Sequence, residues 1–304
     1  MIDFFDHYYS SLRKKNRQQS FLRYLTRSIC NIILPIYLQM KKKEIILPKN
    51  DGLEIIVSIT SFPQRIPKIW LVIECILKQK SLPNKIILWL SKGQFPNEME
   101  DLPRSLTKYV ESNVLEIVFL DEDIRSHKKY YYAFQKFPKD VIITLDDDIY
   151  YPSNIISDLL KTHKKHPNTI CCHRAHTVTK NKNNKLESYT LWEKNYGKFG
   201  PSFKIFHTSG GGTLYKKEMF NEEVLNKEVF KKLSFYADDV WLNIMAQLSG
   251  TKTIKTNYFS NLIPIYDKKA IFKLSVENLG KNGNDIQLKN LIKYYEINED
   301  KVFE

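Results

Sequence analysis

The feature that most constrains the fold is a series of short, β-branched apolar runs separated by segments of helical periodicity. The first run, residues 54–60 (EIIVSIT), ends in the turn Ser61-Phe62-Pro63, and residues 69–79 after it carry apolar side chains at helical spacing. Similar runs cover residues 85–90, 115–120 and 140–145. Runs that are apolar throughout suit strands buried on both faces of a parallel sheet. Alternating with helices, they predict an α/β fold whose crossovers are right-handed.

The second half of the chain has a less regular pattern. We predict strands at residues 169–173 and 203–206, a polar and aromatic loop region over residues 179–200, and helices over residues 218–232, 239–248 and 285–296. A domain boundary is expected near Pro48–Gly52, which divides an N-terminal arm, residues 1–50, from the main body, residues 51–304.

Charge is distributed unevenly between these two parts. The 304-residue chain has a net charge of +13, and residues 1–50 hold ten Lys and Arg residues against three acids, a net charge of +7. A basic arm predicts an anionic partner, either a membrane leaflet or nucleic acid. A solvated tail is the alternative. The 42% hydrophobic content is ample for a sizeable core.

The arm also contains the best candidate for an apolar stretch, Ile29–Met40, although Asn31, Pro35 and Gln39 interrupt it. It lies between arginines and the run Lys41–Lys43. It is too short to span a bilayer, which takes about 20 apolar residues. Such a stretch can lie in the interface of an anionic membrane, and packing on the main body is the alternative. The first 20 residues do not have the pattern of a secretory signal. Four cysteines without a disulfide framework fit a reducing compartment, so we expect a cytoplasmic protein, peripheral at the inner face of the plasma membrane.

Three consecutive acids, Asp146-Asp147-Asp148, directly follow the run at 140–145. Like charges at the end of a buried strand repel each other unless a cation neutralises them. Mg²⁺ and Mn²⁺ prefer carboxylate oxygens. In extended backbone Asp146 and Asp148 point to the same side, so they are the expected metal ligands. The alternative is an acidic turn that caps the following helix, although capping needs one acid only.

The segment 141–152 (VIITLDDDIYYP) resembles the DxD segment of GT-A glycosyltransferases, especially glycosyltransferase family 2 and related bacterial polysaccharide enzymes. The run 54–65 (EIIVSITSFPQR) is similar to the start of that fold, and 237–241 (ADDVW) to its acidic motif on the acceptor side. The resemblance implies a mostly parallel GT-A-like sheet flanked by helices, with a basic helical arm. It implies a nucleotide-binding half at 51–150 and an acceptor-side half at 151–285.

The resemblance also assigns roles on the donor side. It implies that Asp148 is the main ligand of a divalent Mn²⁺ or Mg²⁺ ion and that Asp146 and Asp147 belong to the donor site. It places the nucleotide near Thr60, Ser61 and Phe62, with Arg65 at the diphosphate and Lys129 nearby. A core aromatic is the alternative for Phe62, and an exposed lysine for Lys129. The small-residue turn Gly210, Gly211 and Gly212 is expected to line the donor sugar, and an ordinary turn or β-bulge is its alternative.

On the acceptor side the resemblance implies that Asp239 or Asp238 is the general base of an inverting displacement, with Asp239 preferred. Helix capping is the alternative for this pair. The expected reaction moves a sugar from a nucleotide-sugar donor to a glycan or lipid-linked acceptor.

Two other classes of protein compete with this interpretation. A nucleic-acid-binding protein would explain the charge, but the basic excess is concentrated in the arm, and no recognition motif occurs. A sugar-nucleotide nucleotidyltransferase shares the carboxylate–metal chemistry, but the chain has no Gly-rich triphosphate loop near its start. Zinc at Cys171-Cys172-His173 is disfavoured because two adjacent thiolates do not fit one ion.

Overall fold

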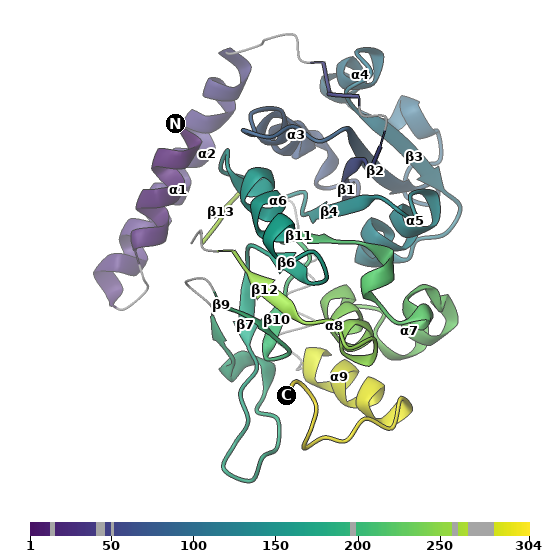
Figure 1. Ribbon diagram of the computed structural model, residues 1–304. Coiled ribbons are helices and arrows are strands. Elements are labelled where there is room, and N and C mark those ends of the chain that lie inside the picture. Colours follow the sequence, from purple (N-terminus) through teal and green to yellow (C-terminus); the bar gives the residue numbers. More distant parts are fainter. Residues whose placement is uncertain (13–15, 41–45, 50–51, 195–198, 257–260, 267–282) are drawn as a thin grey trace.

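The computed structural model describes residues 1–12, 16–40, 46–49, 52–194, 199–256, 261–266 and 283–304. Within these residues the centre of the fold is an eight-stranded sheet in the order β3-β2-β1-β4-β11-β6-β12-β9. Helices cover both faces of the sheet (Figure 1). The α/β class with a mostly parallel, GT-A-like central sheet is therefore confirmed.

The first half of the sheet is parallel and matches the predicted strands closely. Its strands are β1 (Ile55–Thr60), β2 (Lys85–Ser91), β3 (Glu116–Leu120) and β4 (Val141–Leu145). Val57 pairs with Ile86 of β2 on one side and with Ile143 of β4 on the other. The predicted helix at 69–79 is α3 (Ile69–Leu77), and residues 121–137, whose sequence pattern is helical or mixed, contain α5 (Lys128–Lys136). The helix α4 (Arg104–Glu111) was not predicted.

The alternation of side chains along these strands builds two cores, one on each face of the sheet. Val57 and Ile143 belong to a core with α3 and with α6 (Ile155–Lys165). Ile56 and Ile142 point the other way, into a core with α5 and with α8 (Asp238–Leu248). Because both faces are buried, the strands had to be apolar throughout, which is why the sequence showed continuous runs.

The second half of the sheet mixes directions. β11 (Gly211–Tyr215) lies between β4 and β6 (Ile170–Cys172) and is antiparallel to both. β12 (Thr253–Lys255) is parallel to β6, and the edge strand β9 (Phe199–Ser202) is antiparallel to β12. Two small sheets accompany it: β10 (Ile205–His207) with β7 (Ala175–Thr177) and β8 (Glu193–Lys194), and β13 (Ile263–Pro264) with β5 (Ile149–Tyr150). The helices α7 (Lys227–Leu233) and α9 (Gly283–Tyr294) complete this half.

Two predictions in this half were wrong in detail. The single helix expected over residues 218–232 is instead two 3₁₀ turns, Lys217–Met219 and Glu222–Leu225, followed by α7. Asn221 and Asn226 interrupt it because their side-chain oxygens accept hydrogen bonds from the backbone of the next turn. The strand expected at 203–206 is shifted to Ile205–His207, and part of the loop expected at 179–200 is strand, although residues 195–198 lie outside the described residues.

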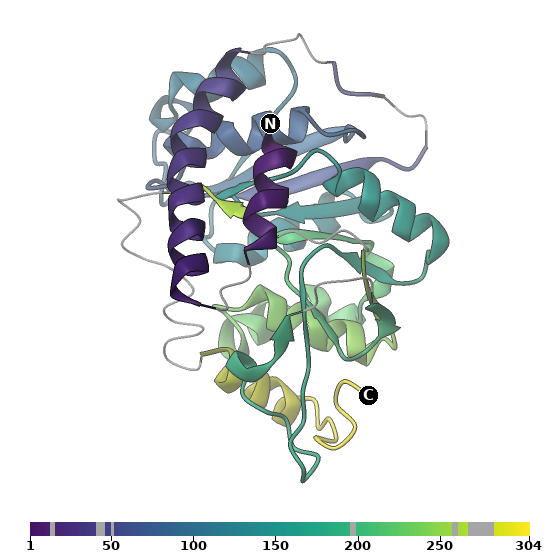
Figure 2. The ribbon, with the colours of Figure 1, turned by 90° about the vertical axis from the view of Figure 1, so that its left-hand side faces the viewer.

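The N-terminal arm forms two helices, α1 (Ile2–Ser11) and α2 (Arg17–Met40), which run side by side along one flank of the molecule (Figures 1 and 2). Cys30, Leu34 and Leu38 of α2 are fully buried and belong to the same core as α3 and α6. The run Lys41–Lys43 and part of the expected boundary, residues 50–51, lie outside the described residues. Among the described helices, none combines the length and the apolar character that crossing a membrane requires.

Candidate active site

The candidate site lies at the edge of the sheet where the parallel strands end. β1 ends before Ser61 and β4 ends before Asp146, and β1 and β4 are parallel neighbours. β11 enters from the same edge, with Gly211 paired to Leu145. In α/β sheets, ligands bind outside this carboxyl edge. The structure therefore brings the predicted residues from 60–65, 146–148, 210–212 and 238–239 into one neighbourhood.

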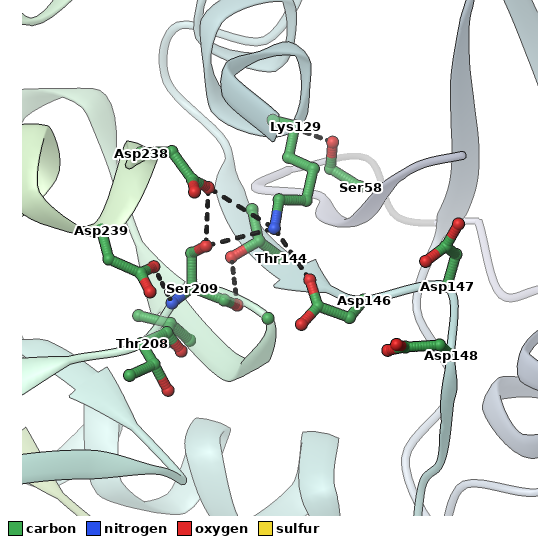
Figure 3. A network of polar contacts seen from close by, with 12 residues as sticks. Ser58, Lys129, Thr144, Asp146, Asp147, Asp148, Thr208, Ser209, Asp238 and Asp239 are labelled. Carbon is green, nitrogen blue, oxygen red and sulfur yellow. Dashed lines mark hydrogen bonds and ion pairs between the residues drawn. The ribbon is translucent and has the colours of Figure 1, made fainter. Parts of the chain in front are cut away.

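Lys129 is the central cation of this neighbourhood (Figure 3). It lies in the first turn of α5 and its side chain is 4% exposed, so the alternative of an exposed lysine was wrong. Its Nζ lies 3.0 Å from Oδ1 of Asp146 and 3.4 Å from Oδ2 of Asp238. It also donates to Oγ of Ser209 at 3.2 Å. Burial lowers the pKa of Lys129, but Asp146 and Asp238 outweigh that effect and raise it, so the lysine is charged.

Ser209 joins the two acids at the start of α8 (Figure 3). Its backbone N–H donates to Oδ1 of Asp239 at 2.6 Å, and its hydroxyl donates to Oδ2 of Asp238 at 2.7 Å. The carbonyl of Ser209 accepts a hydrogen bond from Oγ1 of Thr144 at 2.9 Å. Through Lys129 and Ser209, Asp146 at the end of β4 and the acids of α8 form one polar network.

These contacts give Asp238 and Asp239 different acidities. Burial would raise the pKa of Asp238, but Lys129 and the hydrogen bond from Ser209 hold it at about 2. Burial and the charge of Asp238 raise the pKa of Asp239 to about 7, although Lys129 opposes them. Two adjacent carboxyls whose pKa values differ this strongly suit different tasks, one as a fixed anion and one as a proton acceptor near neutral pH.

The glycine run is explained by close packing at this edge. A Cβ at Gly210 would lie 1.7 Å from Oδ2 of Asp146, so the carboxylate occupies the space that any larger residue would need. A Cβ at Gly211 would lie 2.5 Å from Cβ of Arg174. Gly212 has a φ of +97°, and it sits where the pairing of β11 with β4 shifts register.

The other two aspartates meet Arg65 rather than Lys129. Nη1 of Arg65 lies 2.6 Å from Oδ1 of Asp147, and Nη2 lies 2.9 Å from Oδ2 of Asp148. Oγ of Ser61 donates to the second oxygen of Asp147 at 2.6 Å. Burial raises the pKa of Asp147, and it raises that of Asp148 to about 7 with the help of the neighbouring acids, although Arg65 opposes both shifts. Arg65 alone therefore does not fully compensate these two carboxyls.

The remaining predicted donor residues lie beside this group. Oγ1 of Thr60 donates to the carbonyl of Trp89 at 2.8 Å, which ties the end of β1 to β2. Phe62 is half-buried and its ring centroid lies 5.2 Å from Cζ of Arg65. Lys128, the neighbour of Lys129, instead pairs with Asp123.

The residues fit a divalent cation at Asp146 and Asp148. A third of each of these side chains is exposed, whereas only 6% of the Asp147 side chain is. No group of three or more His, Cys, Asp or Glu side chains that could hold a metal ion occurs in the described part of the chain. Mg²⁺ does not need such a cage, because it is commonly bound through one or two carboxylates, water and substrate phosphates.

Sequence reasoning missed two residues of the site. Ser209 directly precedes the glycine run, and its role as a bridge depends on how the turn before β11 meets the start of α8. Arg174 follows β6, and its Nε donates to Oγ1 of Thr208 at 2.8 Å. Because β6 runs in the same direction as β4, its end lies at the same edge as Asp146. Residues that directly follow parallel strands lie at one edge of a sheet, so the position of Arg174 after a strand was a signal that could have found it.

A mostly parallel sheet of this order, with helices on both faces, is consistent with the Rossmann-like α/β fold of GT-A type. The family model described as Glycosyl transferase family 2 matches residues 66–223, just over half of the chain. The chain belongs to this family, and it is therefore a glycosyltransferase that uses a sugar donor and an acceptor. Enzymes of this family are often dependent on divalent metals. None of the curated proteins matches the chain.

Proposed function

We propose that this glycosyltransferase moves a sugar from a nucleotide-sugar donor to a hydroxyl of a glycan or lipid-linked acceptor, with inversion at the anomeric carbon. The observation that supports this proposal most strongly is the polar network of Lys129 and Ser209. It connects Asp146, a candidate on the donor side, with Asp238 and Asp239, the candidates on the acceptor side.

On the donor side, Asp146 and Asp148 are the proposed ligands of Mn²⁺ or Mg²⁺. When bound, the cation supplies electrostatic stabilisation of the charge that develops on the diphosphate as the sugar leaves. We assign Thr60, Ser61 and Phe62 to the nucleoside, and Arg65 to the diphosphate, because a guanidinium matches phosphate oxygens.

The proposed donor site also includes residues that hold Arg65 and Asp146 in place. Asp147 forms an ion pair with Arg65, and Lys129 forms one with Asp146. The turn Gly210–Gly212 is assigned to the donor sugar. In this proposal residues 51–150 form the nucleotide-binding half, residues 151–285 the acceptor-side half, and residues 1–50 an arm that packs on the main body through α2.

On the acceptor side, Asp239 is the proposed general base. Its carboxylate takes the proton of the attacking hydroxyl while the acceptor oxygen bonds to the anomeric carbon and the bond to the diphosphate breaks. The pKa of Asp239, raised to about 7, favours Asp239 as the base over Asp238. Lys129 keeps Asp238 ionised and forms an ion pair with it. Asp238 is then the anion that holds Lys129 and Ser209.

The proposed acceptor class is based on the N-terminal arm. A basic arm suits an enzyme that works at the inner face of the plasma membrane, and a lipid-linked glycan of a cell-surface polysaccharide is the matching acceptor. Nucleic acid is not a proposed partner, because three clustered acids at the site would repel a phosphate backbone unless a cation intervened.

The test is a thermal-shift screen of nucleoside diphosphates and nucleotide sugars with and without Mn²⁺. A ligand that binds the folded state raises the melting temperature by mass action. We expect one nucleotide to stabilise the protein only when the metal is present, and Asp148→Ala to lose that shift. Glu218→Ala is the control, because its carboxylate is 73% exposed and it follows the end of β11, which runs antiparallel to β4 and so ends at the opposite edge of the sheet.

Two results would contradict the proposal. If the nucleotide raises the melting temperature equally with and without Mn²⁺, the proposed metal ligation at Asp146 and Asp148 is wrong. Release of pyrophosphate from a nucleoside triphosphate, rather than of a nucleoside diphosphate from a nucleotide sugar, would assign nucleotidyl transfer instead.

A further inference from the structure

One face of α2 is both apolar and exposed. Its exposed side chains recur at spacings of three and four residues, which places them in one stripe along the helix: Phe21, Leu25, Ile29, Ile32, Ile36 and Met40. Phe21 is 63% exposed, Ile32 67% and Met40 79%. With 24 residues, α2 is about 36 Å long. A stripe of this length exceeds the scattered exposed apolar residues of an ordinary surface.

The opposite face of α2 fixes the helix to the main body. Cys30, Leu34 and Leu38 are fully buried. Asn31 donates from Nδ2 to the carbonyl of Pro264 at 3.0 Å and accepts from the backbone N–H of Tyr266 at 2.6 Å. The exposed stripe is therefore not an outward-turned core face, because the core face of α2 is already occupied.

The charge around the stripe has one sign. Residues 7–43 contain nine Lys and Arg residues and no Asp or Glu. Four of the nine, Arg13, Lys14, Lys15 and Arg17, precede the stripe in the chain, and Lys41–Lys43 follow it directly. A like-charged second copy of this arm would be repelled. An anionic lipid surface offers negative charge for the basic residues and an apolar layer for the stripe.

We infer that α1 and α2 form a membrane-docking face, which lies flat on an anionic bilayer with the apolar stripe of α2 in the headgroup region. Phe4 and Tyr8 of α1 are exposed as well and lie four residues apart on that helix. Figure 2 shows both helices on the outer surface of this flank, with the rest of the fold behind them. Since no described helix is suited to cross the bilayer, docking is peripheral.

This docking face is linked to the candidate site by a short path. Ile265 donates its backbone N–H to the carbonyl of Asp148 at 2.7 Å, and the neighbouring residues Pro264 and Tyr266 bond to Asn31 of α2. Docking through α2 therefore holds the segment that carries Asp148 at a fixed position relative to the lipid surface. This position would suit an acceptor presented at that surface, a point that rests on the proposed function, whereas the docking itself does not.

The experiment is co-sedimentation of the full chain with vesicles, measured without any sugar transfer. We expect binding to vesicles of phosphatidylcholine mixed with phosphatidylglycerol, weak binding to phosphatidylcholine alone, and release at high salt, since salt screens the basic residues. The double variant Ile32→Gln, Ile36→Gln should bind the mixed vesicles on the order of tenfold more weakly, because two apolar side chains no longer leave water.

The matched control is Ile286→Gln, an exposed isoleucine on α9 that is 54% exposed and should leave vesicle binding unchanged. All variants should keep the melting temperature of the wild type, because the changed side chains are at the surface. Equal binding of the double variant and the wild type would overturn the inference. So would a dimer in light scattering that the double variant converts to a monomer, since a second copy would then be the occupant of this face. A failure of sugar transfer would leave these results unaffected.

Discussion

Replacing Lys129 with methionine tests how the site holds its acids together. Methionine keeps the length of the aliphatic chain and removes the ammonium group that lies 3.0 Å from Asp146 and 3.4 Å from Asp238. Two carboxylates then face each other across the network without the cation between them. The variant should therefore be less stable than the wild type at neutral pH.

The expected size of the effect follows from burial. Removing one partner of a buried ion pair costs about 3–5 kcal/mol. Lys129 is 4% exposed and Asp238 10%, but a third of the Asp146 side chain is exposed, so water screens that part of the interaction. We expect the lower end, about 3 kcal/mol, which lowers the melting temperature of a domain of this size by roughly 6–10 °C.

The loss should depend on pH in a defined direction. Lys129 lowers the pKa of Asp146 and holds that of Asp238 at about 2. A depressed carboxyl contributes stability above its unfolded pKa, which is about 4, and loses that contribution as the pH falls toward the folded value. The difference in the free energy of unfolding between the wild type and Lys129→Met should thus be largest at neutral pH and become smaller as the pH falls below about 4.

Thermal unfolding of both proteins over this pH range measures the difference directly. Lys136→Met is the matched control: Lys136 is on the same helix and pairs with Glu116, but both side chains are more than 40% exposed. Such a surface pair contributes at most about 1 kcal/mol. The reasoning is refuted if Lys129→Met and Lys136→Met have the same melting temperature at neutral pH. It is also refuted if the loss of stability of Lys129→Met relative to the wild type stays constant as the pH is lowered.

Three further predictions concern the reaction. With saturating donor and metal, kcat should fall about tenfold for each pH unit below 7, because protonated Asp239 cannot accept a proton; a rate that stays constant down to about pH 5 would contradict this assignment. Asp239→Asn should keep the metal-dependent nucleotide shift and lose transfer, and if Asp238→Asn alone shows this pattern, Asp238 is the base. Gly210→Ala should destabilise the fold by about 1–3 kcal/mol and abolish the nucleotide shift, since its Cβ would displace the Asp146 carboxylate; an unchanged shift would show that the position of Asp146 does not matter for the donor.

The sequence by itself determined the parallel half of the sheet and the position of the acids. Strands buried on both faces must be apolar throughout, so β1, β2, β3 and β4 could be located to within about one residue from local pattern alone. Because parallel strands end at a common edge, the residues after β1 and β4 lie close together, and Arg65 pairs with Asp147 and Asp148.

Only the tertiary structure decided how the acids are paired. Lys129 reads as an ordinary surface lysine, because its burial depends on α5 packing over β1 and β4, which no local pattern encodes. The strand β11 was missed because it begins within a run of glycines. These positions require glycine because Asp146, after β4, and Arg174, after β6, leave no space for a side chain. The different pKa values of Asp238 and Asp239 likewise arise from the charge of Lys129 on α5 and from hydrogen bonds of Ser209 in the turn before β11, and two identical side chains in sequence cannot reveal them.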